Sequence, residues 1–475
     1  MLSVCALAAS LAALTPDPER ERVVRLMHAE AEHYGALSRQ IWEYAELGYK
    51  EHRSAKLLRD QLQSAGFRIT ENVGGIPTAF VAEWGQGKPV TGIMGEFDAL
   101  PGLSQEAVPE RKPLVEGGAG HGCGHNLFGV AAAHAAIAVK RHLEEKGLAG
   151  TVRFFGTPAE EGGSGKVYMI RAGAFEGTDV VLTWHPGNRN SVNDASMLAI
   201  ISGRFRFRGV PAHASSAPEA GRSALDAVLL MNHATEMLRE HMPREARIHY
   251  VILNGGAAPN IVPDFAETYY YARHPQMAAL DGLWDRILKC AGGAAMATET
   301  RLEHEVESSN YELLPNDALL KLLRRNLSFV GGVRYTAQEQ AFAEKLAATL
   351  EPGRRAALGT QEELFFEEDR LTSSASSDVG DVSWNVPTAQ FTAATWVPGT
   401  PAHSWQSAAC SGMSIGRKGM IVAAKTLALS ALDVFYDPNQ VELARESFRQ
   451  RKGGQEYRSR IPAAKAPPLD YRDKR

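Results

Sequence analysis

The spacing of apolar residues predicts alternating helices and strands through the first part of the chain. Apolar residues recur at helical spacing from Glu19 to about Ala65. Short apolar runs bounded by turn residues follow, and a longer apolar stretch predicts a helix at 127–143. The strands predicted from these runs are 67–70, 78–83, 89–94, 151–155 and 179–184. Strands separated by helices favour an α/β fold with a mixed, largely parallel sheet flanked by helices.

A different order of elements begins near Met197. The pattern there predicts strand, helix, strand, strand, helix and strand, which is the order of a ferredoxin-like α+β unit. We interpret this segment as a domain inserted into the first one. Its predicted elements are 199–208, 220–241, 247–254, 265–273, 277–290 and 298–306.

After Pro315 the pattern returns to helices, at 317–327, 336–350 and 416–435, with one more strand at 389–396. The charged stretch 362–369 is expected to be a solvated loop or helix end, and the small-residue stretch 373–381 a loop. The polar and basic segment after Asp437 is expected to be loosely attached to the rest.

Composition adds limits on size and on partners. The 475 residues, 44% of them hydrophobic, are more than one core usually serves, so about two domains are expected. Lysine and arginine total 51 against 55 acidic residues, which leaves a net charge of −4 and no overall attraction to nucleic acid or to an anionic membrane. The four cysteines lie far apart in the sequence and do not form a disulfide framework.

The N-terminal segment Leu2–Leu14 is apolar and rich in alanine. It resembles the core of a secretory signal, but no basic residue precedes it. It is too short to span a bilayer, and no other run approaches the roughly 20 apolar residues that a membrane helix needs. We expect a cytoplasmic protein without a membrane partner, or an exported, periplasmic one if this segment is the remnant of a signal.

Residues with metal-binding or acid–base chemistry follow three of the predicted strands. If these strands are parallel, their carboxyl ends meet at one edge of the sheet, where open α/β sheets bind ligands. Each residue alone could be an ordinary loop residue, but their convergence on one edge favours a shared site. The residues are Asp98, Glu160, Glu161 and His185.

The turn 121–126, with the sequence HGCGHN, precedes the helix predicted at 127–143. Its glycines let the backbone bend so that Cys123 and His125 can face one ion. Thiolate and imidazole are good zinc ligands, and imidazole also suits manganese. The alternative is a glycine-rich turn with a buried cysteine and incidental histidines.

Six short motifs are spread along the chain: EFDALP at 96–101, HGCGH at 121–125, PAEE at 158–161, WHP at 184–186, GVPAHA at 209–214 and GTPAH at 399–403. Together, in this order, they resemble the M20 family of metallopeptidases and amidohydrolases. Two longer runs, EFDALPGLSQ at 96–105 and GTPAHSWQ at 399–406, are most similar to the group within this family that acts on p-aminobenzoyl-glutamate.

The resemblance implies a zinc-exopeptidase-like catalytic domain with two divalent metal ions, manganese or zinc, and an inserted lid or dimerisation domain. Glu160 would be the general base and then the general acid, and Asp98 would orient a ligand. His213 would stabilise the oxyanion, commonly from the partner subunit, while Asn260 and Arg273 would bind substrate. The implied metal ligands are Cys123, His125, Glu161, His185 and His403.

The implied activity is hydrolysis of p-aminobenzoyl-glutamate or a similar N-acyl amino acid, through attack by a metal-bound hydroxide. The implied partners are this small-molecule substrate and a second subunit, in a homodimer or with a homologous chain. The chain would then have five parts: an apolar N-terminal segment (1–18), the catalytic domain in two pieces (19–196 and 309–437), the inserted domain (197–308) and a polar tail (438–475).

Two departures from the family pattern leave the exact substrate open. Asn126 stands where relatives often have aspartate, and the segment 44–47 lacks the histidine and proline of a related pattern. An aminoacylase or dipeptidase of the same chemistry therefore stays an alternative. So do a cysteine hydrolase that uses Cys123 with a histidine base and a metal-binding subunit without catalysis.

Overall fold

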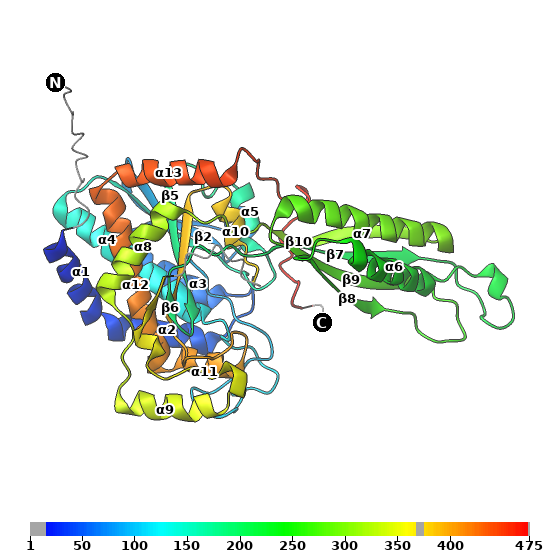
Figure 1. Cartoon of the computed structure of the whole chain (residues 1–475), viewed down its shortest axis with the longest axis horizontal. Helices are drawn as coiled ribbons and strands as arrows, with labels where there is room; N and C mark the ends of the chain where they lie inside the picture. Colours follow the sequence, from blue (N-terminus) through cyan, green and yellow to red (C-terminus); the bar gives the residue numbers. More distant parts are fainter. Residues whose placement is uncertain (1–15, 367–374, 474–475) are drawn as a thin grey trace, which may run out of the picture.

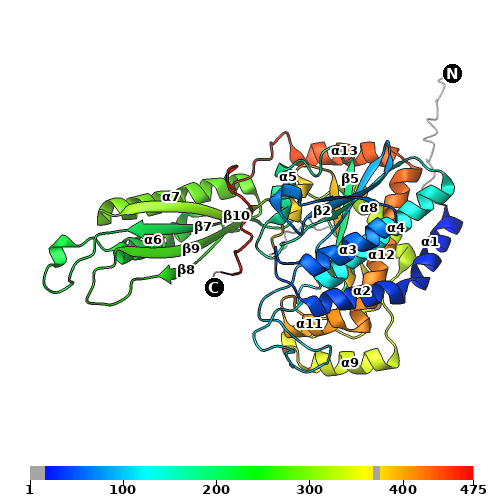
Figure 2. The same ribbon diagram turned by 180° about the vertical axis from the view of Figure 1, so that it is seen from behind.

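The computed structural model describes residues 16–366 and 375–473. They form a larger body, in which helices pack around a central sheet, and an elongated smaller body that projects from its side (Figures 1 and 2). The apolar segment Leu2–Leu14 lies outside the described residues, as do parts of the stretches 362–369 and 373–381.

Eight strands form the sheet of the larger body, in the order β1-β2-β4-β3-β5-β12-β6-β11. Its four central strands, β4, β3, β5 and β12, pair in parallel, whereas β1 and β2 pair in antiparallel. All six residues of β3 are buried, as expected of a parallel strand covered on both faces. The expected α/β fold with a largely parallel sheet is therefore confirmed. The strands are β1 (Arg68–Glu71), β2 (Phe80–Gln86), β3 (Val90–Gly95), β4 (Gly150–Gly156), β5 (Val180–Gly187), β6 (Asn190–Ser191), β11 (Leu364–Phe365) and β12 (Thr388–Ala394).

The helical region expected at 19–65 is three helices rather than one. The helix α2 ends at Tyr44. The next residue, Ala45, has a left-handed φ of 43°, and a turn leads from there to α3. The helices of the larger body are α1 (Asp17–Ala29), α2 (Ala31–Tyr44), α3 (His52–Ser64), α4 (His125–Lys146), α5 (Gly165–Arg171), α8 (Asp317–Val330), α9 (Ala337–Ala348), α10 (Val379–Ser383), α11 (Trp405–Gly412), α12 (Ser414–Tyr436) and α13 (Asn439–Lys452).

The helices α4 and α12 are the centre of the helical layer. They pack against each other, α4 also against β3 and α12 also against β5 and α8, and most of their residues are buried. Apolar residues all around a helix suit a position inside a core. Among the described helices, α12 alone is long and apolar enough to cross a membrane, but 89% of its apolar stretch is buried inside the protein.

The smaller body, called the lid here, is a four-stranded antiparallel sheet in the order β10-β7-β9-β8 with two helices on one face. Burial alternates strictly along β9, where Ala266, Thr268, Tyr270 and Ala272 point toward the helices. The expected βαββαβ order is confirmed. The elements are β7 (Ala199–Arg208), α6 (Ala224–Leu238), β8 (Arg247–Asn254), β9 (Phe265–His274), α7 (Met277–Thr298) and β10 (Arg301–Asn310).

The expectation of a loosely attached C-terminal tail is wrong. Residues 439–452 form α13, and the segment 453–473 then crosses from the larger body to the lid (Figure 1). Its basic residues pair with acids of the lid: Arg460 with Asp281 on α7, and Lys465 with Glu305 on β10. Ile461 is 2% exposed and anchors the segment in an apolar cluster. Composition alone did not reveal these distant partners.

Candidate metal centre

The parallel strands bring the predicted site residues to one edge of the sheet. Gly95, the last residue of β3, pairs with Gly156, the last of β4, so the segments with Asp98 and Glu160 start side by side. His185 lies near the carboxyl end of β5, opposite Thr392 of β12, and the loop after β12 leads to His403. The carboxyl ends of all four central strands therefore supply the site.

The turn 121–126 completes the site at the start of α4. Gly124 has a φ of +76°, and a Cβ there would lie 2.8 Å from Pro186, so glycine is needed at this point. The backbone N–H of His403 donates to the carbonyl of Gly122 at 3.0 Å, which ties the β12 loop to the turn. Asn126 lies in the first turn of α4 and donates to the carbonyls of Ser38 and Ser411, which ties the start of this helix to two other segments.

Seven side chains gather their donor atoms in three overlapping groups, and within each group the atoms lie within 4.8 Å of one another. Two of the groups share the thiol of Cys123, which thus lies between two clusters. The five expected ligands all belong to these two, and Glu160 belongs to the third. The groups are Cys123, His125 and His185; Cys123, Glu161 and His403; and Glu96, His125 and Glu160.

Hydrogen bonds orient two of the imidazoles. Asp98 accepts from Nδ1 of His125 at 2.9 Å, and His185 donates from Nδ1 to the carbonyl of Pro186 at 2.7 Å. Both bonds leave Nε2 directed into the cluster, the usual arrangement of a metal-binding histidine. Asp98 also accepts from the backbone N–H of Glu161 at 2.9 Å and so links two donors. His121 instead donates to the carbonyl of Ile41, and burial lowers its pKa to about 3.

The chemistry of the cluster fits divalent cations. Burial and the nearby Cys123 raise the pKa of Glu161 to about 7. Burial, Glu96 and Glu161 hold the pKa of Glu160 well above its usual range. Among the described residues, Nε2 of His125 and Oε1 of Glu161 are buried without a hydrogen bond of acceptable geometry. A bound cation would stabilise these clustered acids and would give the unpaired nitrogen and oxygen atoms a partner.

Several residues that support the site carry no sequence signal. The buried carboxylate of Glu51 accepts from the backbone N–H of Ala159 at 2.8 Å and holds that residue at a left-handed φ of 58°, directly before Glu160. The ammonium of the buried Lys166 lies 2.7 Å from Glu96 and 2.6 Å from Asp378. Lys166 thus partly neutralises the acids beside Glu160, which lowers the cost of gathering them.

The residues expected to bind substrate or the oxyanion are divided between the two ends of the lid. Arg273 lies at the end of β9 next to the larger body and donates to Ser376 at 2.8 Å. His213 and Asn260 lie together in loops at the opposite end, where the N–H of Ala214 donates to the carbonyl of Asn260. Because β7 has ten residues, roughly 30 Å of strand separates the two ends. Within one chain His213 therefore does not reach the metal centre.

Two residues near the C-terminus, Tyr471 and Arg472, contact the backbone of the proposed metal ligand Glu161. The hydroxyl of Tyr471 donates to the backbone carbonyl of Glu161 at 3.1 Å, and the guanidinium of Arg472 donates to the same oxygen. The ring of Tyr471 lies edge-on against Tyr49, whose hydroxyl donates to the carbonyl of Gly163 at 2.6 Å. The C-terminal segment therefore restrains the loop that carries Glu160 and Glu161.

Removing these contacts is expected to weaken metal binding. The double variant Tyr471→Phe, Arg472→Gln frees the carbonyl of Glu161, so metal affinity should fall about 10- to 100-fold, as for other outer contacts of metal sites. Titration with a metal-sensitive dye measures this. The control Arg449→Gln removes an exposed arginine of α13 and should bind metal as the wild type does. Unchanged affinity in the double variant would contradict the role of the C-terminal segment.

Comparison with known proteins places this geometry in a family. Residues 92–428 match the model of the peptidase family M20/M25/M40. The chain belongs to the M20 family. It is 42% identical to one of the subunits of the p-aminobenzoyl-glutamate hydrolase of Escherichia coli K12, over 92% of this chain and 96% of that one. It is 32% identical to a mouse Xaa-Arg dipeptidase, over 90% and 92% of the two chains.

The fold of this M20 protein is also that of a solved relative. A dinuclear metal-binding M20 peptidase from Bacillus subtilis superposes with a TM-score of 0.59 at 18% identity, over 86% of this chain and 99% of the other. The chain is thus a metal-dependent amidohydrolase or peptidase. The cluster at the sheet edge supplies its candidate metal ligands.

Proposed function

We propose that this enzyme hydrolyses the amide bond of p-aminobenzoyl-glutamate or a similar N-acyl amino acid with two divalent ions, manganese or zinc. The observation that carries the proposal is the pair of donor groups that share Cys123, with the carboxylate of Glu160 alongside. In this proposal the ions are held by Cys123, His125, Glu161, His185 and His403. Mixed thiolate, imidazole and carboxylate ligands suit both metals.

The residues around the cluster would divide the chemistry of amide hydrolysis between them. When bound, divalent ions supply Lewis acidity, which polarises the amide carbonyl and lowers the pKa of water toward about 7. Glu160 takes the proton of the attacking water and passes it to the departing amine. Asp98 holds His125 and the backbone of Glu161 in place. Arg273, at the end of β9 next to the larger body, would bind a carboxylate of the substrate.

The relatives support the choice of substrate class and define the runner-up. The E. coli relative at 42% identity is named for p-aminobenzoyl-glutamate, and the mouse relative at 32% for Xaa-Arg dipeptides. The segments 96–105 and 399–406 carry the likeness to the first group. A dipeptidase or aminoacylase is the second candidate. A subunit without catalysis is less well supported, because every candidate ligand and Glu160 are present.

Substrate profiling together with chelation tests the proposal. We expect p-aminobenzoyl-glutamate to be cleaved faster than acetyl amino acids or Xaa-Arg dipeptides, and activity to disappear on dialysis against a chelator and return with manganese or zinc. Release of p-aminobenzoate measured by absorbance follows the reaction. Rapid cleavage of aliphatic substrates alone would favour the runner-up. Activity that survives the chelator but is lost on alkylation of Cys123 would favour a cysteine hydrolase.

We also propose that the active enzyme is a dimer, of two copies of this chain or with a homologous chain. The outer strand β8 lies at the edge of the lid sheet and exposes Val251, Ile252 and Leu253. Unpaired apolar edge strands are common pairing surfaces. A partner could bring its own His213 to this metal centre. A cytoplasmic location is part of the same proposal, with export as the alternative if Leu2–Leu14 proves to be a signal.

A further inference from the structure

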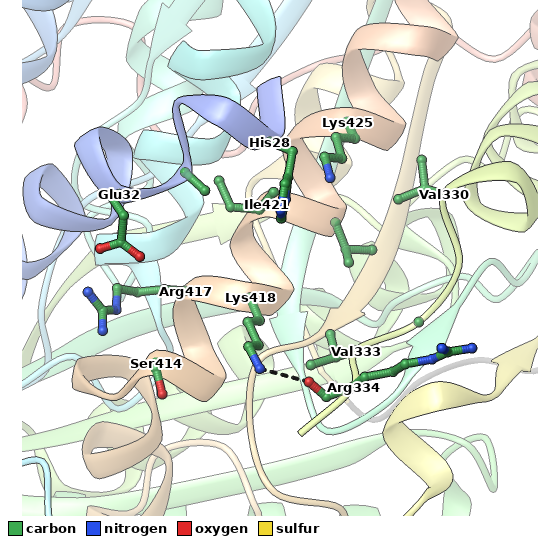
Figure 3. A pocket seen from close by; sticks show the side chains of 13 residues that line it. His28, Glu32, Val330, Val333, Arg334, Ser414, Arg417, Lys418, Ile421 and Lys425 are labelled. Carbon is green, nitrogen blue, oxygen red and sulfur yellow. Dashed lines mark hydrogen bonds between the residues drawn. The ribbon is translucent and has the colours of Figure 1, made fainter. Parts of the chain in front are cut away.

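A second site is suggested by a cavity that no candidate metal ligand lines. It has a volume of about 280 Å³ and lies between α1, α2, the connection from α8 to α9 and the first half of α12 (Figure 3). This volume is near the lower end of the roughly 300–1,000 Å³ of pockets that hold small molecules. It is large enough for a ligand the size of a substituted benzene.

The wall of the cavity carries four cationic side chains and one acid. Two of the cations are already paired: Nζ of Lys418 lies 2.5 Å from Glu339, and Arg334 lies 3.6 Å from Glu362. Arg417 and Lys425 remain, and Glu32 is the single acid of the wall that could balance their charge. The cations are Arg334, Arg417, Lys418 and Lys425, and the acid is Glu32.

Lys425 is the residue that points to a ligand. Its side chain is 9% exposed and extends from α12 toward the cavity (Figure 3). Among the described residues, none forms a hydrogen bond or an ion pair with its ammonium, and burial lowers its pKa. Most of Lys425 is withdrawn from solvent, and an ammonium in such surroundings is stabilised by a charged partner. An anion in the cavity would supply that partner.

Apolar side chains in the rest of the wall favour a ligand that has an apolar part as well as a charge. Val330, Val333 and Ile421 supply apolar surface close to the cationic groups. An inorganic anion would leave this surface without a partner, whereas a ligand with an acidic group and an apolar body would use both parts. We propose that this cavity binds a small organic carboxylate, with its carboxylate at Lys425 and its apolar part against the valines and Ile421.

Calorimetric titration of the metal-loaded protein with benzoate tests this proposal. Benzoate can also bind the ions of the metal centre. The deciding measurement is therefore the difference in benzoate affinity between the wild type and the variants. Lys425→Met keeps an unbranched side chain, one atom shorter, but removes the charge, and should weaken one class of benzoate sites about 10- to 100-fold. The control Lys345→Met removes an exposed lysine of α9 and should bind as the wild type does. Benzamide, of similar shape but neutral, should not occupy the site.

Thermal unfolding gives an independent measurement. Lys425→Met should unfold at a higher temperature than the wild type without benzoate, because the uncompensated charge is gone, and should lose the wild type's stabilisation by benzoate. Equal benzoate affinity in the wild type and in Lys425→Met would overturn the proposal. A wild-type protein that binds no benzoate would also overturn it, even if Lys425→Met proves more stable. Phosphate binding as tight as benzoate binding would overturn the assignment to organic carboxylates.

Discussion

Replacing Glu160 by glutamine is expected to lower turnover by about 10²- to 10⁴-fold, the range that a general base contributes, while the metal content stays unchanged. Glutamine keeps the size of the side chain but cannot accept a proton from water. Glu160 belongs to the donor group with Glu96 and His125 and to neither group that contains Cys123. The two effects should therefore separate: hydrolysis is lost, but the ions remain.

Initial rates on p-aminobenzoyl-glutamate and metal analysis of the same preparation give the two measurements. The control Glu176→Gln changes an exposed glutamate on the connection between α5 and β5 and should leave both unchanged. A Glu160→Gln variant with more than a tenth of the wild-type rate would exclude Glu160 as the base. A variant that loses its metal would show instead that Glu160 is a ligand, in line with its place in the third donor group.

The edge of the sheet where the site lies could be predicted because parallel strands carry a local signal. Runs such as 89–94 and 151–155 are mostly apolar, and acids follow each of them within a few residues. Once the strands are parallel, topology alone brings Asp98, Glu160 and His185 together. The turn 121–126 was recognisable for a similar reason, since its glycines and donor residues are adjacent in sequence.

The supporting residues could not be predicted because their partners are distant in sequence. Lys166 looks like a surface lysine of a short helix, and its burial depends on Asp378, 212 residues later. Glu51 lies 108 residues before the backbone that it holds. The basic C-terminal segment likewise resembles a solvated tail until its acids on the lid are known. Local sequence encodes none of these contacts, and each depends on the finished fold.

The lid shows a further limit, because one chain does not contain the whole predicted site. His213 is exposed, and its Nδ1 accepts from the backbone N–H groups of Ser215 and Ser216 at 3.3 and 3.2 Å. These bonds leave the ring proton on Nε2, so His213 presents an N–H donor to the outside. Such a donor suits a developing oxyanion, and in the proposed dimer that oxyanion would belong to the neighbouring subunit.

Replacing His213 by alanine should therefore lower turnover about 10²- to 10³-fold, the cost of one oxyanion donor, without changing the metal content. Mixing this variant with Glu160→Gln should restore activity. In a mixed dimer the His213→Ala subunit keeps its Glu160 and receives an intact His213 from its partner. If subunits of a twofold dimer exchange at random, about a quarter of wild-type activity should return. Two inactive variants that stay inactive after exchange, or a fully active monomer, would place His213 outside the reaction.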